Sequence, residues 1–390
     1  MAKIKDIYLG LCSFAVFEKL MKKPLFTSFF EYVKAVGEDE KIKKYAAFVS
    51  EIYKGGASLS GCVRACVFED ENVYVKAVGN MEKIASSMWT AVEHELDVLS
   101  AFAALTPEDF KGDIGTECFV PPFEVGKADI KAEYESRLGS IGKYGYGIFA
   151  SNGMFYLSEE GEILPIATAD PITLEKFVGY KDERQKVLAN TEAFLSGKPA
   201  ANVLLYGDAG TGKSSTVKAV ANHFFEEGLR LIEIRKNQLL LLPKIMGEIG
   251  GNPLKFIIFI DDLSFNSNDD DFSMLKATLE GSASAKAKNA VIYATSNRRH
   301  IVKETFSERA GDDLHRNDTV QENLSLSARF GLTVLFAKPE KKLYLEIIHE
   351  LAERQGIKVD AEIETKAEAF ALQKGYRSAR CAEQFIESLI

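Results

Sequence analysis

The stretch GDAGTGKSS, residues 207–215, has the spacing of a loop that wraps around phosphate groups. Gly207, Gly212, Lys213 and Ser214 satisfy the pattern G-x-x-x-x-G-K-S/T. The apolar run NVLLY precedes the loop, and the run TVKAVANHFF, which has helical character, follows it. Because this strand–loop–helix order is the context in which the pattern binds phosphate, we predict a nucleotide site here rather than an empty glycine-rich turn.

Each residue type in the loop has a physical task. Glycines let the backbone curl so that successive N–H groups point at phosphate oxygens, and the following helix adds the positive end of its dipole. Lys213 is expected to reach the β- and γ-phosphates, and the Ser214 hydroxyl to contact Mg²⁺. The loop residues predicted to bind nucleotide are Gly207, Asp208, Ala209, Gly210, Thr211, Gly212, Lys213, Ser214 and Ser215.

A second stretch, FIIFIDDLSF at residues 256–265, runs five large apolar residues into two aspartates. Buried carboxylates are rare unless they are engaged, which argues against a merely solvated strand end. In proteins with a phosphate loop, an acid at the end of a strand holds the Mg²⁺ shell, and we assign this role to Asp261. Asp262 is predicted to lean toward the γ-phosphate and to polarise an attacking water.

Three further polar residues stand at the ends of predicted elements. NAVIYATSNRRH places Asn297 after an apolar strand, where its amide is predicted to hydrogen-bond the attacking water, although Ser-Asn also makes turns. LSLSARFGLTVLF places Arg329 at a helix-to-strand junction, for which an arginine finger acting on a neighbouring subunit and a surface salt bridge are the alternatives. GYRSARCAEQF places Arg380 behind Ser378, a predicted N-cap, where it either contacts phosphate or stays solvated.

The chain divides into three predicted regions. Residues 1–170 carry mostly helical patterns, with a small β section near 145–167. There YGIFASNGMFYL is predicted to form a hairpin about its Ser-Asn-Gly turn, and ILPIA to add a third strand. Residues 171–337 alternate continuous apolar runs with helices, which is typical of a parallel sheet covered on both faces. Residues 338–390 read as three helices.

Composition restricts the class of protein. The 390 residues are 46% hydrophobic and 27% charged, as in ordinary globular proteins of two or three domains. The net charge of −9 argues against non-specific binding to nucleic acid or to an anionic membrane. Five cysteines, an odd number, favour reduced thiols, and no apolar run is long enough to span a bilayer. We therefore predict a cytoplasmic protein without a membrane partner.

Taken together, GDAGTGKSS, FIIFIDDLSF, YATSNRR, LSARF and SARCAEQF resemble the Walker A, Walker B, sensor 1, box VII arginine and sensor 2 motifs of AAA+ ATPases, in that order. The resemblance covers about residues 175–390. Within it, FVGYKDERQKVLANTEAFLSGKPANVLLYGDAGTGKSS and IYATSNRRH look like one particular branch, an uncharacterised bacterial family of predicted ATP-binding proteins, a domain of unknown function with a helical N-terminal region. It implies a Rossmann-like α/β P-loop NTPase (AAA+) core, a helical lid, ATP with Mg²⁺ and a homo-oligomer. It also implies that Phe177, Val178 and Gly179 contact adenine.

Two positions depart from the motifs. Ala379 stands where a glycine usually precedes the sensor 2 arginine, which is a mild change. Asp262 stands where the second Walker B acid is often glutamate. Aspartate is one methylene shorter, and about 1 Å of misplacement costs on the order of a hundredfold in rate. An Asp-Asp pair also occurs in the AAA+ branch of bacterial replication initiators and helicase loaders, so the substitution indicates slow turnover.

We therefore expect a slow, Mg²⁺-dependent ATPase, an ATP-driven switch or remodelling factor whose N-terminal region binds an unidentified protein partner. One alternative is a nucleotide-gated scaffold that binds ATP with negligible hydrolysis. A second alternative is a DNA-associated, helicase-loader-like ATPase, although the acidic net charge favours a solvated face for the basic residues concerned. Those residues are Lys286, Lys288, Arg298, Arg299 and His300.

Overall fold

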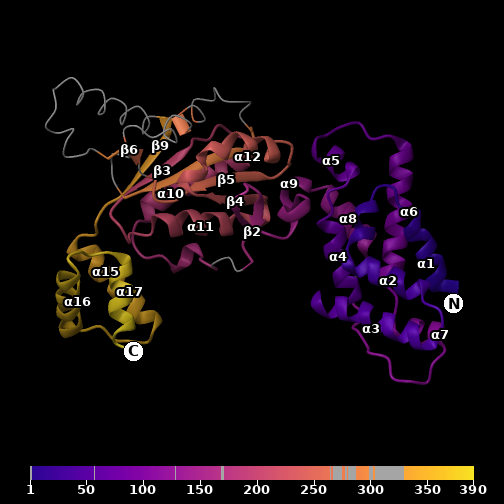
Figure 1. Cartoon of the computed structure of the whole chain (residues 1–390). Coiled ribbons are helices and arrows are strands. Elements are labelled where there is room, and N and C mark those ends of the chain that lie inside the picture. The colour runs from indigo at the N-terminus through magenta and orange to yellow at the C-terminus, as the bar shows by residue number, and fades with distance from the viewer. Residues whose placement is uncertain are drawn as a thin grey trace. The chain divides into compact units, whose positions relative to one another are not determined.

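The computed structural model describes residues 2–56, 58–127, 129–167, 171–263 and 329–390, together with 265–266, 275–276, 279, 287–297 and 302–303. The chain divides into two compact units (Figure 1). One unit is formed by Met1–Ser151 with Gly251–Pro253, and the other by Asn152–Gly250 with Leu254–Ile390. Within the described ranges, no helix is both long enough and apolar enough to cross a membrane.

The N-terminal unit is helical and is built around aromatic side chains. Its helices are α1 (Ala2–Cys12), α2 (Pro24–Lys34), α3 (Glu38–Lys54), α4 (Leu59–Phe68), α5 (Val73–Gly79), α6 (Ser86–Ala103), α7 (Pro107–Ile114), α8 (Ile130–Leu138) and α9 (Ile141–Tyr144), with the 3-10 turns η1 (Glu18–Lys22) and η2 (Gly147–Ala150). The ring of Phe29 lies 4.7 Å from that of Phe102, a separation at which aromatic pairs add to hydrophobic burial. The N-terminal helix α1 is amphipathic, with Ile4, Ile7 and Leu11 buried on one face.

A buried carboxylate fixes the chain where it leaves α1. Glu95 of α6 is 2% exposed and accepts hydrogen bonds from the backbone N–H groups of Ala15 (2.8 Å), Val16 (3.1 Å) and Phe17 (2.8 Å). A buried backbone N–H without a partner is costly, and the ends of helices leave such groups. Glu95 therefore supplies the hydrogen bonds that the chain needs between α1 and η1.

A seven-stranded sheet forms the centre of the second unit, in the order β2-β1-β4-β5-β7-β3-β9. All neighbouring strands pair in parallel except β1 and β2, which are antiparallel. The strands are β1 (Met154–Leu157), β2 (Ile163–Pro165), β3 (Val203–Gly207), β4 (Leu229–Ile234), β5 (Lys255–Ile260), β7 (Ala290–Ser296) and β9 (Leu332–Phe336), and two short strands, β6 (Phe265–Asn266) and β8 (Val302–Lys303), pair separately. The predicted parallel α/β fold class is confirmed.

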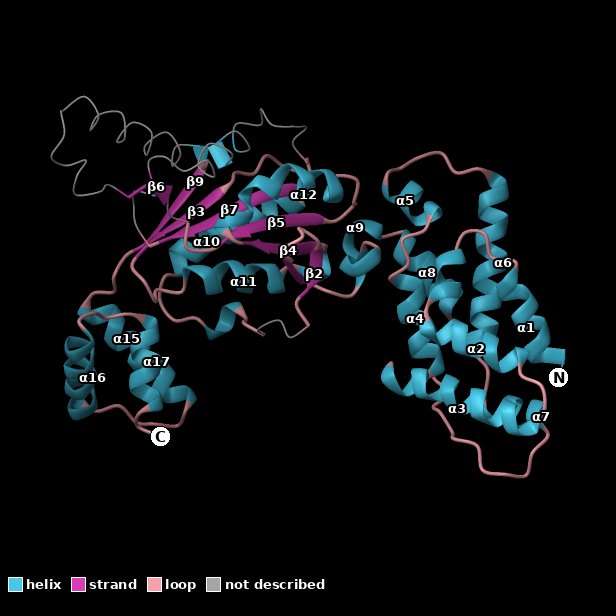
Figure 2. Ribbon diagram, viewed as in Figure 1, coloured by secondary structure: helices cyan, strands magenta, loops and turns pink. Residues whose placement is uncertain are grey.

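The direction of successive connections places helices on both faces of the sheet. From β3 the chain passes through α11 (Lys213–His223) to β4, and from β4 through η5 (Lys236–Leu241) and α12 (Leu242–Ile249) back to β5. The two connections run in opposite directions across the sheet, so right-handed crossovers put α11 and α12 on opposite faces, as Figure 2 shows. Burial on both faces explains why β5 is a continuous apolar run.

The hairpin predicted for YGIFASNGMFYL is wrong in its first half. Gly147–Ala150 forms η2, with Gly147 at φ +66°, which breaks an extended strand. Only β1 is a strand, and it pairs with β2 on one side and with β4 on the other, where Met154 lies opposite Leu231. The β section predicted near 145–167 is thus the edge of the large sheet. The second unit begins at Asn152, which is earlier than the boundary predicted near residue 170.

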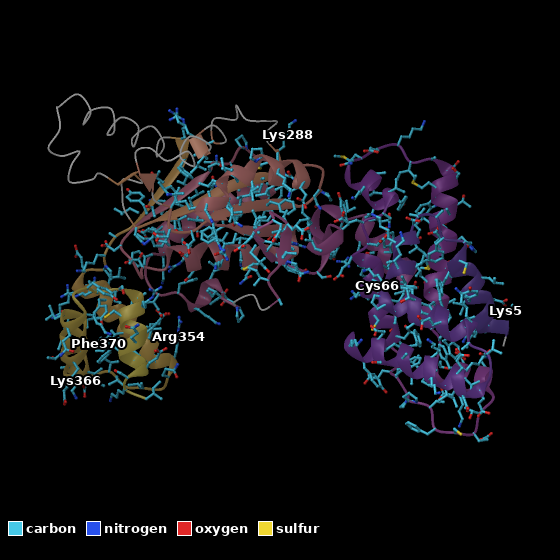
Figure 3. All side chains as sticks on the ribbon, viewed as in Figure 1. Lys5, Cys66, Lys288, Arg354, Lys366 and Phe370 are labelled. Carbon is cyan, nitrogen blue, oxygen red and sulfur yellow. The ribbon has the colours of Figure 1, made fainter. Side chains whose placement is uncertain are left out.

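Three helices after β9 form a small bundle, α15 (Lys341–Arg354), α16 (Ala361–Lys374) and α17 (Ala379–Glu387), which we call the lid. Its core includes Tyr344, Ile348 and Phe385. Ser378 is the predicted N-cap of α17, and its Oγ accepts the N–H of Cys381 at 3.1 Å. The guanidinium of Arg354, labelled in Figure 3, donates to the Glu175 carbonyl at 3.0 Å and so ties the lid to the segment between β2 and β3.

Candidate functional site

The phosphate loop connects β3 to α11. At Gly207 the φ is +135°, and a Cβ there would overlap the backbone of Phe336 in the neighbouring strand β9. Only glycine fits such an approach. Gly212, at φ +89°, is the last residue before α11 begins at Lys213. The helix N-terminus therefore opens into the loop, which is the arrangement that binds anions.

The ammonium group of Lys213 is buried at the start of α11. The residue is 5% exposed, and its Nζ donates to the carbonyl oxygens of Gly207 (2.9 Å) and Asp208 (2.7 Å) and to Oδ1 of Asn297 (3.0 Å). Desolvation lowers the pKa of Lys213, and the charges of Asp208, Asp261 and Asp262 oppose this shift. A cation held in this way is expected to attract an anionic ligand.

Asp261 and Ser214 meet at the end of β5. The Ser214 hydroxyl donates to Oδ1 of Asp261 at 2.6 Å. The Thr295 hydroxyl, from the end of β7, donates to the same carboxylate oxygen. Two hydroxyls thus lie within hydrogen-bonding distance of one carboxylate oxygen, and oxygen atoms are the ligands that a hard divalent cation prefers.

Asp262 occupies a backbone conformation that explains why an aspartate stands there. Its φ is +51°, in the left-handed region, where aspartate and asparagine are several-fold enriched over other non-glycine residues. Its N–H donates to Oγ1 of Thr295 at 2.9 Å, and its carboxylate accepts the Nδ2 group of Asn297 at 2.8 Å. The Asp-Asp sequence is therefore suited to this turn as well as to the chemistry of a carboxylate.

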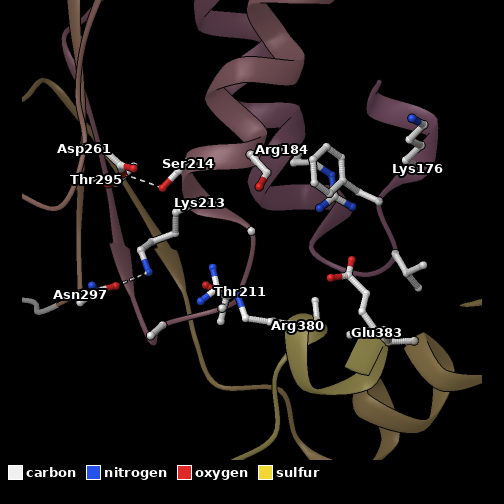
Figure 4. Close-up of a pocket in the computed structure, with 18 of the residues that line it drawn as sticks. Lys176, Arg184, Thr211, Lys213, Ser214, Asp261, Thr295, Asn297, Arg380 and Glu383 are labelled. Atoms are coloured by element: carbon white, nitrogen blue, oxygen red, sulfur yellow. Dashed lines mark hydrogen bonds between the residues drawn. The ribbon is translucent and has the colours of Figure 1, made fainter. Parts of the chain in front are cut away.

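The strand order determines which side chains meet. β7 lies between β5 and β3, so Asn297, just beyond β7, lies between Asp262 after β5 and Lys213 after β3. Its amide accepts a hydrogen bond from Lys213 through Oδ1, which is drawn as a dashed line in Figure 4. The same amide donates to Asp262 through Nδ2. One amide thus links the buried ammonium to the second carboxylate.

These side chains line one end of a cavity of about 360 Å³, within the usual size of a small-molecule site. The lining residues are Lys176, Phe177, Val178, Arg184, Ala209–Ser215, Asp261, Asp262, Thr295, Asn297, Ile347, Leu351, Ala379, Arg380 and Glu383. Figure 4 shows that the polar end lies at the phosphate loop and that Arg380 and Glu383 come from the lid. Desolvation raises the pKa of Glu383, against the opposing charge of Arg380.

The other end of the cavity combines an aromatic ring, a guanidinium and apolar side chains. The guanidinium of Arg184 lies 5.1 Å from the ring centre of Phe177 and donates to the Gly179 carbonyl. Desolvation lowers the pKa of Arg184. Ile347 and Leu351 of α15 also line the cavity. Flat and apolar surfaces of this kind suit a ring system.

Most of the predicted site residues come together here, and a few lie elsewhere. Among the described residues, those that line the cavity do not include Gly179, Gly207, Asp208 or Arg329. Arg329 precedes β9, whose first residue pairs with the first residue of β3, whereas the phosphate loop leaves the opposite end of β3. Arg329 therefore lies near the start of the parallel strands, whereas the phosphate loop lies at their carboxyl ends. Of the basic residues considered for DNA, Lys286, Arg298, Arg299 and His300 lie outside the described residues, and Lys288 is described.

Sequence reasoning did not identify Thr295, Arg184 or Glu383 as site residues. Thr295 carried a signal, because it is a polar residue near the end of an apolar strand, two positions before Asn297. Residues two apart on a strand share a face, which would have indicated it. Arg184 and Glu383 lie on helices and show no local signal, because their places at the cavity depend on how α10 (Lys181–Leu195) and the lid pack.

The parallel sheet, the phosphate loop between β3 and α11, the acids after β5, the amide after β7 and the helical lid define an α/β P-loop fold of the AAA+ class. Residues 151–390, more than half of the chain, match the model of a family described as "Protein of unknown function (DUF815)". The chain belongs to this family. No curated protein matches it.

Two solved structures illustrate what the chain is similar to. The Holliday junction branch migration motor RuvB of Thermotoga maritima is 15% identical, with a TM-score of 0.33, over 56% of this chain and 72% of that chain. AMPPCP-bound DnaA of Aquifex aeolicus is 17% identical, with a TM-score of 0.39, over 57% of this chain and 65% of that chain. The fold assignment rests on the sheet and the phosphate loop rather than on these distant likenesses.

We predict that Lys213→Met leaves the nucleotide-free protein at least as stable as the wild type, because the fold disfavours the charged form of Lys213. Between the lowered pKa and the ordinary value of about 10.4, the unfolded chain binds more protons than the folded one, so wild-type stability rises with pH. The advantage of Lys213→Met should therefore shrink as pH rises through this window. Urea unfolding at several pH values measures it.

The matched control is Lys198→Met, at an exposed position. A loss of more than about 2 kcal/mol in Lys213→Met at neutral pH, comparable to leaving several buried groups unpaired, would contradict the account of Lys213 as a charge held in the fold for a ligand.

Proposed function

We propose that the protein is a Mg²⁺-dependent ATPase that works as a slow ATP-driven switch or remodelling factor. One observation carries the proposal: Lys213, the Ser214–Asp261 pair and the Asn297–Asp262 pair converge at one end of a single cavity. Positive charge, oxygen ligands and a carboxylate bound to an amide are the groups that phosphoryl transfer to water requires. The distribution of these groups along the cavity indicates where each part of the nucleotide binds.

The oxygen atoms of Ser214 and Asp261 fit Mg²⁺. They lie 2.6 Å apart in the present hydrogen bond, and Mg²⁺ prefers few protein oxygens together with substrate phosphates. When bound, the ion would neutralise charge on the phosphates. Thr295 holds the Asp261 carboxylate and so fixes the direction of its oxygen atoms. Lys213 would exchange its bonds to Gly207, Asp208 and Asn297 for bonds to phosphate oxygens.

Asp262 and Asn297 would orient the attacking water. The Asp262 carboxylate would accept a proton from that water, while the Asn297 amide, already bonded to Asp262 at 2.8 Å, would hold the carboxylate in place. The short side chain of Asp262 limits its reach, and about 1 Å of misplacement costs on the order of a hundredfold in rate. This is the physical basis for proposing slow turnover.

The opposite end of the cavity would hold the adenine ring. Phe177 and Val178 line it, and Gly179 stands just outside the lining while its carbonyl accepts a hydrogen bond from Arg184. Arg380 lines the cavity from the lid, where it would contact phosphate. Arg329 lies near the start of the parallel strands, which suits action on a neighbouring subunit of a homo-oligomer. We assign partner binding to the N-terminal unit, and the five free cysteines fit a cytoplasmic setting.

Purified protein is expected to release phosphate from MgATP, and Lys213→Met is expected to abolish both release and tight ATP binding, because it removes the cation that faces the phosphates. Since this variant should remain folded, the loss would reflect the site. Equal phosphate release from wild type and Lys213→Met would sink the ATPase assignment.

A second candidate, a nucleotide-gated scaffold with negligible hydrolysis, is favoured by the exposed, short carboxylate of Asp262. Asp262→Asn separates the two candidates. Asparagine tolerates the left-handed backbone as well as aspartate does, so the turn should persist while the acceptor of the proton is lost. The ATPase account predicts a fall in phosphate release of about a hundredfold with ATP affinity nearly unchanged.

The companion variant Asp262→Glu tests whether a longer side chain brings the carboxylate closer to the attacking water, although glutamate adopts a positive φ less often than aspartate. If neither variant alters phosphate release, Asp262 is not the catalytic base. Tight ATP binding and ATP-dependent oligomerisation without measurable turnover in the wild type would then favour the scaffold.

A further inference from the structure

The segment that joins β9 to the lid, residues 337–340, which we call the linker, is held by two side chains from the core. The Asp208 carboxylate, in the phosphate loop, accepts the backbone N–H of Lys338 at 2.9 Å. The Tyr180 hydroxyl, beside Phe177–Gly179, donates to the carbonyl of Ala337 at 2.6 Å. Consecutive linker residues are thus bonded to segments from opposite ends of the cavity.

Asp208 joins the linker to the group that meets phosphate. Its carbonyl accepts from the Lys213 ammonium at 2.7 Å, and its N–H donates to the Phe336 carbonyl at the end of β9 (3.2 Å). The Thr211 hydroxyl donates to the Asp208 carbonyl at 2.9 Å. When Lys213 moves from the Asp208 carbonyl to a phosphate, Asp208 loses a hydrogen bond at its carbonyl. The carboxylate of the same residue holds the N–H of Lys338.

Tyr180 joins the linker to the other end of the cavity. It is 8% exposed, and its ring lies 5.3 Å from that of Phe336. Burial raises its pKa to about 12, so the hydroxyl stays protonated and able to donate at physiological pH. Tyr180 directly follows Gly179 in the chain. A ring bound against Phe177 and Val178 would therefore restrain the backbone segment that carries Tyr180.

We infer that Asp208 and Tyr180 are positioning residues that couple nucleotide binding to the lid through the linker. The inference rests on the proposed function. It also gives Asp208 a role other than contact with the nucleotide, in keeping with its absence from the described lining of the cavity. A second contact also joins the phosphate loop to the lid: the N–H of Arg380 donates to the Gly210 carbonyl at 3.3 Å. The phosphate loop therefore contacts both the linker, through Lys338, and the last helix of the lid, through Arg380.

Hydrogen exchange of the lid and linker, residues 337–390, with and without MgATP tests the coupling in the full chain. In the wild type, ATP should change exchange in these residues. In Tyr180→Phe, ATP affinity should stay within about threefold, while the ATP-induced change in exchange should fall by about fivefold or more, the lower range of measured couplings. Asp208→Ala and Asp208→Asn both remove the charge near Lys213, but only Asp208→Ala removes the acceptor oxygen, so the fall is expected in Asp208→Ala at ATP concentrations that saturate it. Asp208→Asn keeps an acceptor oxygen and should retain the wild-type response.

The comparison is between bound and free protein, so a merely structural loss, which shifts both states together, would not produce this result. Tyr180→Phe removes one hydroxyl and keeps the ring, so the test stands even if Asp208→Ala does not fold. The inference is overturned if either folded variant keeps the full response, if the variants lose ATP binding itself, or if ATP binds the wild type without changing lid exchange. Absence of ATP binding to the wild type would instead refute the proposed function.

Discussion

The buried ammonium of Lys213 is the constraint on which the arrangement of this site depends. A charged group in a poorly solvated position must be satisfied by hydrogen bonds or by opposite charge. Here two carbonyl oxygens of the phosphate loop and the amide of Asn297 provide the hydrogen bonds, and three aspartates provide the negative charge. The two carbonyl oxygens and the amide are neutral partners, which a bound phosphate would replace in the proposed function.

The strand order makes this arrangement follow from topology. Parallel strands end at the same edge of a sheet, and ligands bind outside that edge. With β7 between β5 and β3, the residues after each strand stand in the order carboxylate, amide, lysine. Thr295 completes the set, since its hydroxyl contacts Asp261 and accepts the N–H of Asp262. The left-handed backbone at Asp262 then accounts for aspartate at the position where resemblance leads one to expect glutamate.

Local sequence patterns predicted the central strands of the sheet and the phosphate loop. They failed where a segment is positioned by partners that lie far along the chain. The apolar runs of β3, β5 and β7 and the loop glycines could be read directly, because each signal lies within a few residues. The first half of the predicted hairpin was wrong because Gly147–Ala150 forms a 3-10 turn, and β1 instead pairs with β2 and with β4, which lies far along the chain. The helical residues Arg184 and Glu383 were missed for the same reason, since α10 and the lid bring them to the cavity only when the unit packs. Asp208 matched the loop pattern, yet its carboxylate faces the linker rather than the cavity.

The central claim is that Lys213, Ser214 and Asp261 form one site for a nucleotide with its metal ion. The most direct measurement is calorimetric titration of ATP into the protein with Mg²⁺ and with a chelator, for the wild type and for Asp261→Asn. The account predicts that Mg²⁺ strengthens ATP binding to the wild type by about tenfold or more, the effect of one charge-assisted contact, and that Asp261→Asn removes most of this gain. Equal ATP affinity with and without Mg²⁺ in the wild type, or an undiminished gain in Asp261→Asn, would contradict it.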